Sequence, residues 1–124
     1  MRVELQQIHK RFGATHALKG IDLEVEAGTI HGLVGENGAG KSTLMKILTG
    51  YLGRSSGRIL LDGRAADYGT PAQAAAHGIG MLYQEPQDFP PLSVLENFMV
   101  GRDSHPDGNR VRQRRRLQRL AEEA

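Results

Sequence analysis

The residues of this chain best suited to chemistry form one glycine-rich run. Its spacing satisfies G-x-x-x-x-G-K-[ST], the pattern of a loop that cradles phosphate. Glycines let the backbone approach phosphate oxygens closely, and Lys41 would bring a positive charge to the β- and γ-phosphates. The Ser42 hydroxyl would bind Mg²⁺. We therefore expect a site for a nucleoside triphosphate and Mg²⁺ at Gly35, Glu36, Asn37, Gly38, Ala39, Gly40, Lys41, Ser42 and Thr43.

Such a loop needs a strand that ends just before it and a helix that begins within it. Residues 29–34 are mostly apolar, which predicts a buried strand that delivers the chain into Gly35. Apolar residues fall on helical spacing from 42 to 48, and Gly50 ends this helix. The alternative is a chance glycine-rich turn before a helix, and the predicted context argues against it.

The remaining pattern mixes strands and helices. Strands are predicted near residues 3–8, where the alternation is imperfect, at 21–26, at 58–61 before the turn pair Asp62-Gly63, and at 79–83. Helices are predicted after Pro71, after Ser93, which forms a capping box with Glu96, and in the arginine-rich C-terminal part; residues 102–109 are predicted to be a loop. Strands first, then alternating helix and strand, indicate an α/β fold with an antiparallel portion at the start.

Composition excludes several classes of protein and site. No apolar run approaches the roughly 20 residues of a membrane-spanning helix, and cysteine is absent, which excludes disulfides and thiolate metal sites. The five histidines lack metal-ligand spacing. The arginines at 110–119 could bind nucleic acid or anionic lipid, but no aromatic residue lies among them to stack on bases. We interpret them as a solvated helix face and expect no nucleic-acid partner.

Nearly the whole chain resembles the ABC-type ATPases. Phe12, in front of the phosphate loop, matches the aromatic residue on which that family stacks adenine, and Ala17 matches the small residue on the adenine's other side. Gln84, after the stretch 79–83 and before 92–97, matches the family's glutamine that reaches Mg²⁺ and the attacking water. The resemblance implies ATP and Mg²⁺ as ligands, Lys41 and Gln84 as catalytic residues, and Ser42 and Gln84 as metal ligands.

A finer resemblance is to the ATPase subunits of bacterial sugar importers of the ribose, galactose and autoinducer kind. Residues 35–48, 70–71, 78–79, 83–85 and 92–102 carry it. It implies a transport-coupled ATPase on the inner face of the cell membrane. Its partners would be transmembrane permease subunits, a second ATPase domain or subunit and, indirectly, a periplasmic or surface solute-binding protein. Nucleoside importers share much of this pattern, so the transported solute stays open.

The family's signature loop, Walker B aspartate, catalytic glutamate and switch histidine have no match in these residues. We therefore expect an incomplete domain, the N-terminal part of a first ATPase domain, which on its own does not hydrolyse ATP. Residues 1–102 would be the partial nucleotide-binding core, and residues 103–124 the start of the helical subdomain. Two alternatives stay open: a soluble ABC-type ATPase, and a truncated chain that binds nucleotide without hydrolysing it.

Overall fold

The computed structural model describes residues 1–85, 88–100 and 110–123. The chain divides into two compact units, Met1–Leu82 and Tyr83–Ala124, and each is described by itself. The expected division at residue 102 stays a prediction.

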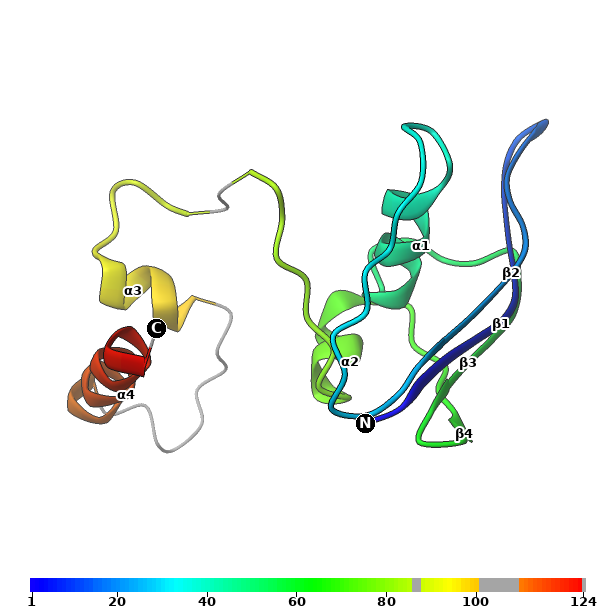
Figure 1. Cartoon of the computed structure of the whole chain (residues 1–124). Helices are drawn as coiled ribbons and strands as arrows, with labels where there is room; N and C mark the ends of the chain where they lie inside the picture. The colour runs from blue at the N-terminus through cyan, green and yellow to red at the C-terminus, as the bar shows by residue number, and fades with distance from the viewer. Residues whose placement is uncertain (86–87, 101–109, 124) are drawn as a thin grey trace. The chain divides into compact units, whose positions relative to one another are not determined.

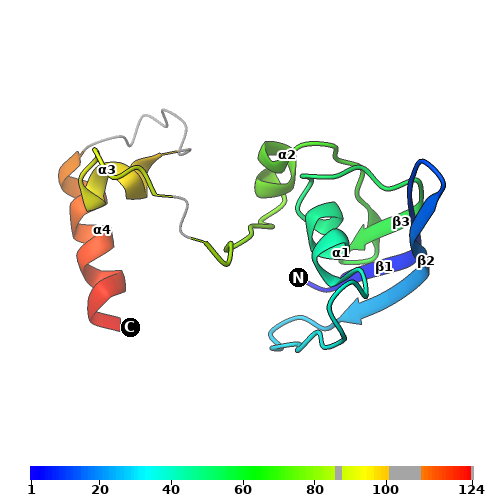
Figure 2. The same cartoon turned by 90° about the horizontal axis from the view of Figure 1, so that it is seen from above.

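The first unit contains a four-stranded antiparallel sheet (Figures 1 and 2). Its order is β2-β1-β3-β4, with the bounds β1 Val3–Phe12, β2 Thr15–Val25, β3 Ser56–Leu61 and β4 Arg64–Ala65. The β3–β4 hairpin turns at Asp62 and Gly63, both with positive φ (50° and 75°), as a two-residue hairpin turn requires. The predicted antiparallel portion is therefore present, and its strands are longer than expected.

β1 contains a bulge at Gln6 and Gln7 that explains its imperfect alternation. The register shifts there against both neighbouring strands, and Gln7 has φ 50°. Its backbone N–H donates to Asp22 Oδ1 at 2.8 Å instead of joining the ladder. The extra residue lets Leu5 and Ile8, three positions apart, both point into the core, where they are almost fully buried.

Helix α1 (Lys41–Leu48) packs on the sheet and is the helix predicted from the sequence. Leu44 and Ile47 from α1 join residues of β1, β2 and β3 in one hydrophobic cluster. Figures 1 and 2 show α1 and α2 (Pro71–Ala76) on the same side of the sheet. Thr70 caps α2 by accepting a hydrogen bond from the Gln73 N–H, as expected for proline in a first turn.

The C-terminal end of α1 is tightly packed against the start of α2. A Cβ on Gly50, which has φ 75°, would lie 2.5 Å from the Thr70 carbonyl oxygen, so only glycine fits there. Tyr68 donates its hydroxyl hydrogen to the Leu48 carbonyl at 2.6 Å, which satisfies one of the unpaired carbonyls at this helix end. The predicted helix end at Gly50 is therefore also a packing site.

The second unit contains helices α3 (Val94–Met99) and α4 (Arg110–Glu123). The predicted capping box is present: Ser93 Oγ accepts from the Glu96 N–H, and Glu96 Oε2 accepts from the Ser93 N–H. The side chains of α4 described in the structure are exposed or half-buried, in keeping with a solvated arginine face. The loop predicted at 102–109 lies outside the described residues. Among the described helices, none is both long and apolar enough to cross a membrane.

Two predicted strands are absent. Residues 29–34 and 79–83 have no regular secondary structure, and Ile30, Val34 and Leu82 are more than 90% exposed. A strand exists only when a neighbour pairs with its backbone, and no other described segment pairs with either one. The prediction of two strands here was therefore wrong for this structure, because an apolar run forms a strand only when another segment pairs with it.

Exposed apolar side chains next to unpaired backbone favour association, because each segment can accept a strand from another copy. We expect the purified chain to form concentration-dependent oligomers, which multi-angle light scattering at several concentrations would detect. The variant Ile30→Lys/Val34→Lys should shift the distribution toward monomer, because it places charge on one of these segments. A wild-type monomer that stays monomeric at all concentrations and melts cooperatively would contradict this prediction.

Candidate functional site

The glycine-rich segment closes around the ammonium of Lys41. Lys41 Nζ donates to the Glu36 carbonyl at 2.7 Å and also to the Gly35 carbonyl. The Ala39 N–H donates to the Glu36 carbonyl at 3.1 Å, which forms a turn inside the loop. Because an ammonium has three donors, these two bonds leave one for a ligand oxygen. The predicted phosphate loop is thus a curled segment with its cation held inside.

Gly40 determines where this loop meets the sheet. It has φ 89° and immediately precedes α1, and Leu44 donates its N–H to the Gly40 carbonyl to begin the helix. A Cβ at Gly40 would lie 2.6 Å from Leu18 Cδ2 and 3.3 Å from the Ala17 carbonyl oxygen. The loop therefore rests on β2, directly against Ala17, which the resemblance assigned to the adenine.

The first turn of α1 offers further groups to an anion. The N–H groups of the first helical residues have no partner within a helix, and the helix dipole places partial positive charge there. No acidic residue lies in this first turn. Ser42 is exposed at this point, and its hydroxyl is a hard oxygen ligand of the kind Mg²⁺ accepts. No group of three or more His, Cys, Asp or Glu side chains that could hold a metal ion occurs among the described residues. In this part of the site, Ser42 and phosphate oxygens would be the ligands of a magnesium ion.

Phe12 and Ala17 lie on the hairpin formed by β1 and β2. Figure 1 shows the turn of this hairpin (blue) and the phosphate loop (cyan) at the same end of the first unit. Phe12 pairs with Thr15 at the last rung and is 48% exposed, so its ring is open to a ligand. Lys10 Nζ lies 5.0 Å from the centre of this ring. Lys10 belongs to no sequence motif, although its position two residues before Phe12 on a strand puts it on the same face.

Two histidines bridge the same hairpin. His9 Nδ1 and His16 Nε2 lie 3.1 Å apart, and the rings stack with centroids 5.2 Å apart. One ring must be neutral to accept this hydrogen bond. Partial burial lowers the pKa of His16, and the positive charges of Arg11, His9 and Lys19 lower it further. From the sequence alone, the histidines are expected to be structural or solvated, because the sequence does not reveal the strand pairing that joins these two.

The remaining predicted site residues lie in the loop, in α1 and in the second unit. Glu36, Asn37, Gly38 and Ala39 are exposed loop residues, and Thr43 is half-buried in the first turn of α1. Gln84 is an exposed residue of the second unit, so its approach to Mg²⁺ and the attacking water stays a prediction.

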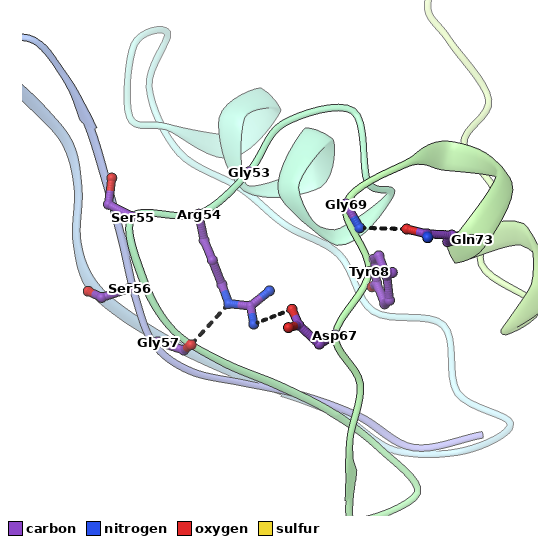
Figure 3. Close-up of a pocket in the computed structure, with 9 residues that line it drawn as sticks. All are labelled: Gly53, Arg54, Ser55, Ser56, Gly57, Asp67, Tyr68, Gly69 and Gln73. Carbon is purple, nitrogen blue, oxygen red and sulfur yellow. Dashed lines mark hydrogen bonds and ion pairs between the residues drawn. The ribbon is translucent and has the colours of Figure 1, made fainter.

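A pocket of about 560 Å³ in the first unit does not coincide with this site (Figure 3). Arg54 lies in it, with Nε donating to the Gly57 carbonyl at 3.0 Å and a terminal nitrogen to Asp67 at 3.1 Å. The Gly69 N–H donates to Gln73 Oε1 at 2.9 Å. Because these polar groups satisfy one another, we assign the pocket a structural role: it joins the start of β3 to the segment that leads into α2.

Comparisons with known proteins identify the family that this chain resembles. A family model described as ABC transporter matches residues 18–124. The ribose import ATP-binding protein RbsA of Lacticaseibacillus paracasei is 47% identical over 103 residues, which are 83% of this chain and 21% of that protein. The protein of the same name from Halalkalibacterium halodurans is 44% identical over 123 residues, 99% of this chain and 25% of that protein. The chain thus spans about a fifth to a quarter of these curated relatives.

Solved structures give a similar picture. A nucleotide-free ATP-binding cassette from an ABC transporter superimposes with a TM-score of 0.75 at 34% identity, over 82% of this chain and 41% of that one. An ATP-binding cassette of an ABC transporter in its ADP conformation gives a TM-score of 0.73, also at 34% identity, over 82% and 40%.

The histidine pair predicts a pH dependence of stability. The folded pKa of His16 lies below its ordinary value of 6.5, so the folded state binds fewer protons than the unfolded state in this range. The contribution of His16 to the free energy of unfolding is therefore present in full above pH 6.5. It is lost as the pH falls from there through the folded pKa. Urea unfolding should show a larger loss of stability between pH 7.5 and 5.5 for the wild type than for His16→Gln. The exposed His31→Gln is the control; equal losses in the wild type and His16→Gln would contradict the prediction.

Proposed function

Because this chain belongs to the ABC transporter family, whose model matches residues 18–124, we propose that it is the ATP-binding part of an importer ATPase. Membership confirms the fold class predicted from the sequence, a P-loop ATPase domain of ABC type with an antiparallel N-terminal sheet. The observation that carries the proposal is the Lys41 ammonium, held inside a curled glycine loop at the start of α1.

The loop would bind the triphosphate mainly through charge and backbone donors. Lys41 would neutralise the β- and γ-phosphates, and the N–H groups of the loop and of the first turn of α1 would bind their oxygens. Phe12 would stack on adenine, with Ala17 beside the base. Such positioning and charge neutralisation are most of what phosphoryl transfer requires from a protein.

Mg²⁺ would be held by Ser42 and the phosphates, with Gln84 as a further ligand, and would neutralise charge that develops on the phosphate oxygens. Gln84 would also orient the attacking water. A base for that water has no assigned residue in this chain, because the family's catalytic glutamate has no match here. Hydrolysis is therefore proposed only for a chain that also contains the family's downstream motifs, and not for these residues alone.

The names of the relatives favour import of a sugar over the other functions considered. Those of L. paracasei and H. halodurans are ribose import ATP-binding proteins, and their likeness extends across most of this chain. We infer a cytoplasmic location, peripheral on the inner membrane face, with permease subunits and a second ATPase domain or subunit as partners. A solute-binding protein would act through the permease. The solute itself would be selected by those partners.

Removal of the loop cation should weaken ATP binding. Charge-assisted hydrogen bonds contribute about 1.5–3 kcal/mol each, so Lys41→Ala should raise the Kd for Mg·ATP about ten- to a hundredfold. Titration calorimetry or a fluorescent ATP analogue would measure this Kd. The matched control is Lys46→Ala, which removes an exposed lysine from the same helix and should leave the Kd unchanged. Equal affinities for wild type and Lys41→Ala would reject the loop as the phosphate site.

The chain alone should release phosphate from ATP no faster than its Lys41→Ala variant. General-base catalysis contributes about 10²–10⁴-fold, so a missing base should be obvious in a malachite-green or coupled assay. A version extended through the family's downstream motifs should exceed both. Turnover by the 124-residue chain that depends on Lys41 would instead mean that one of its own acidic residues serves as the base.

A further inference from the structure

The ring of Phe12 has a cation over one face. Lys10 Nζ lies 5.0 Å from the ring centroid, within the range of a cation–π interaction. The same ammonium donates a hydrogen bond to the Gly53 carbonyl at 2.6 Å. Lys10 is half-buried, whereas Phe12 is 48% exposed. The lysine is thus the more enclosed partner, and the ring is the one that solutes can reach.

Gly53 lies in the segment 49–55 that follows α1, and this segment is bonded to the end of β1 at two further points. The Arg11 N–H donates to Ser55 Oγ at 3.0 Å, and the Ser55 N–H donates to the His9 carbonyl at 2.8 Å. These two bonds hold the backbone of the strand. Only the Lys10 ammonium, among the groups in these bonds, also reaches the ring of Phe12.

We propose that Lys10 is a positioning residue for adenine recognition. Bonded to Gly53, it fixes the ring of Phe12 from one face and leaves the other face for the base. A ring that is already held loses less rotational freedom when a base stacks on it, so the stacked complex is more stable. This inference rests on the proposed function, because it takes Phe12 to be the adenine-stacking residue.

The test compares two ligands that share a triphosphate but differ in the base. The Kd values for Mg·ATP and for Mg·tripolyphosphate are measured at one ionic strength for the wild type, Lys10→Met, Lys10→Arg and Phe12→Ala. Lys10→Met keeps an apolar stem and should weaken ATP about two- to fivefold while tripolyphosphate binding is unchanged. Lys10→Arg keeps the cation and should restore ATP binding. Phe12→Ala should weaken ATP about five- to 150-fold, again without an effect on tripolyphosphate.

Lys19→Met is the matched control, because it removes one exposed positive charge from the same hairpin. It should leave the ratio of the two Kd values at the wild-type level. Unchanged tripolyphosphate binding also verifies that each variant retains a folded phosphate loop. The proposed role of Lys10 is wrong if Phe12→Ala changes the ratio of the Kd values and Lys10→Met does not, or if Lys10→Met binds ATP more tightly. The proposed function stands in either case. If Phe12→Ala leaves the ratio unchanged, the adenine site itself is wrong, and the inference fails with it.

Discussion

The close approach of Gly40 to β2, which leaves no room for a methyl group, determines where the predicted phosphate loop lies. Gly40 approaches Leu18 and Ala17 of β2 so closely that a Cβ would collide with the leucine side chain, and its backbone has a positive φ that L side chains rarely adopt. The start of α1, where Lys41 is the first residue, therefore lies against a strand of the sheet. Position 40 therefore needs glycine for a steric reason. This is in addition to the access that glycines would give phosphate oxygens to the backbone.

The same strand belongs to the hairpin that carries Phe12, so the proposed phosphate and base sites would share one support. Ala17 belongs to both: its carbonyl lies against the phosphate loop, and its position matches the family's adenine-contacting residue. The histidine pair joins the two strands of this hairpin, and the Lys10 ammonium lies 5.0 Å from the ring centroid of Phe12. The proposed base site and the proposed phosphate site are thus connected through β2, and no direct bond between Phe12 and Lys41 is needed.

Interactions between neighbouring residues made much of the fold and site predictable from the sequence. The features that could not be predicted depend on pairing between distant segments. The start of α1, the capping box at Ser93 and the turn at Asp62-Gly63 depend on neighbouring residues, and the sequence contains all of those. The segments 29–34 and 79–83 have the composition of strands, but a strand also needs a partner that no other described segment supplies. Lys10 and the histidine pair escaped notice because their partners are brought to them by strand register and by a loop 43 residues away.

Helix α1 is held at both ends by glycines. Gly40 rests on Leu18 before its first turn, and Gly50 rests on the Thr70 carbonyl, next to the N-terminus of α2, after its last. Eight helical residues extend for about 12 Å and bend little over that length. The helix can therefore act as a rigid lever. A displacement of the phosphate loop would then move α1 as a whole against the start of α2, because the backbone lies close to its neighbours at both ends of the helix.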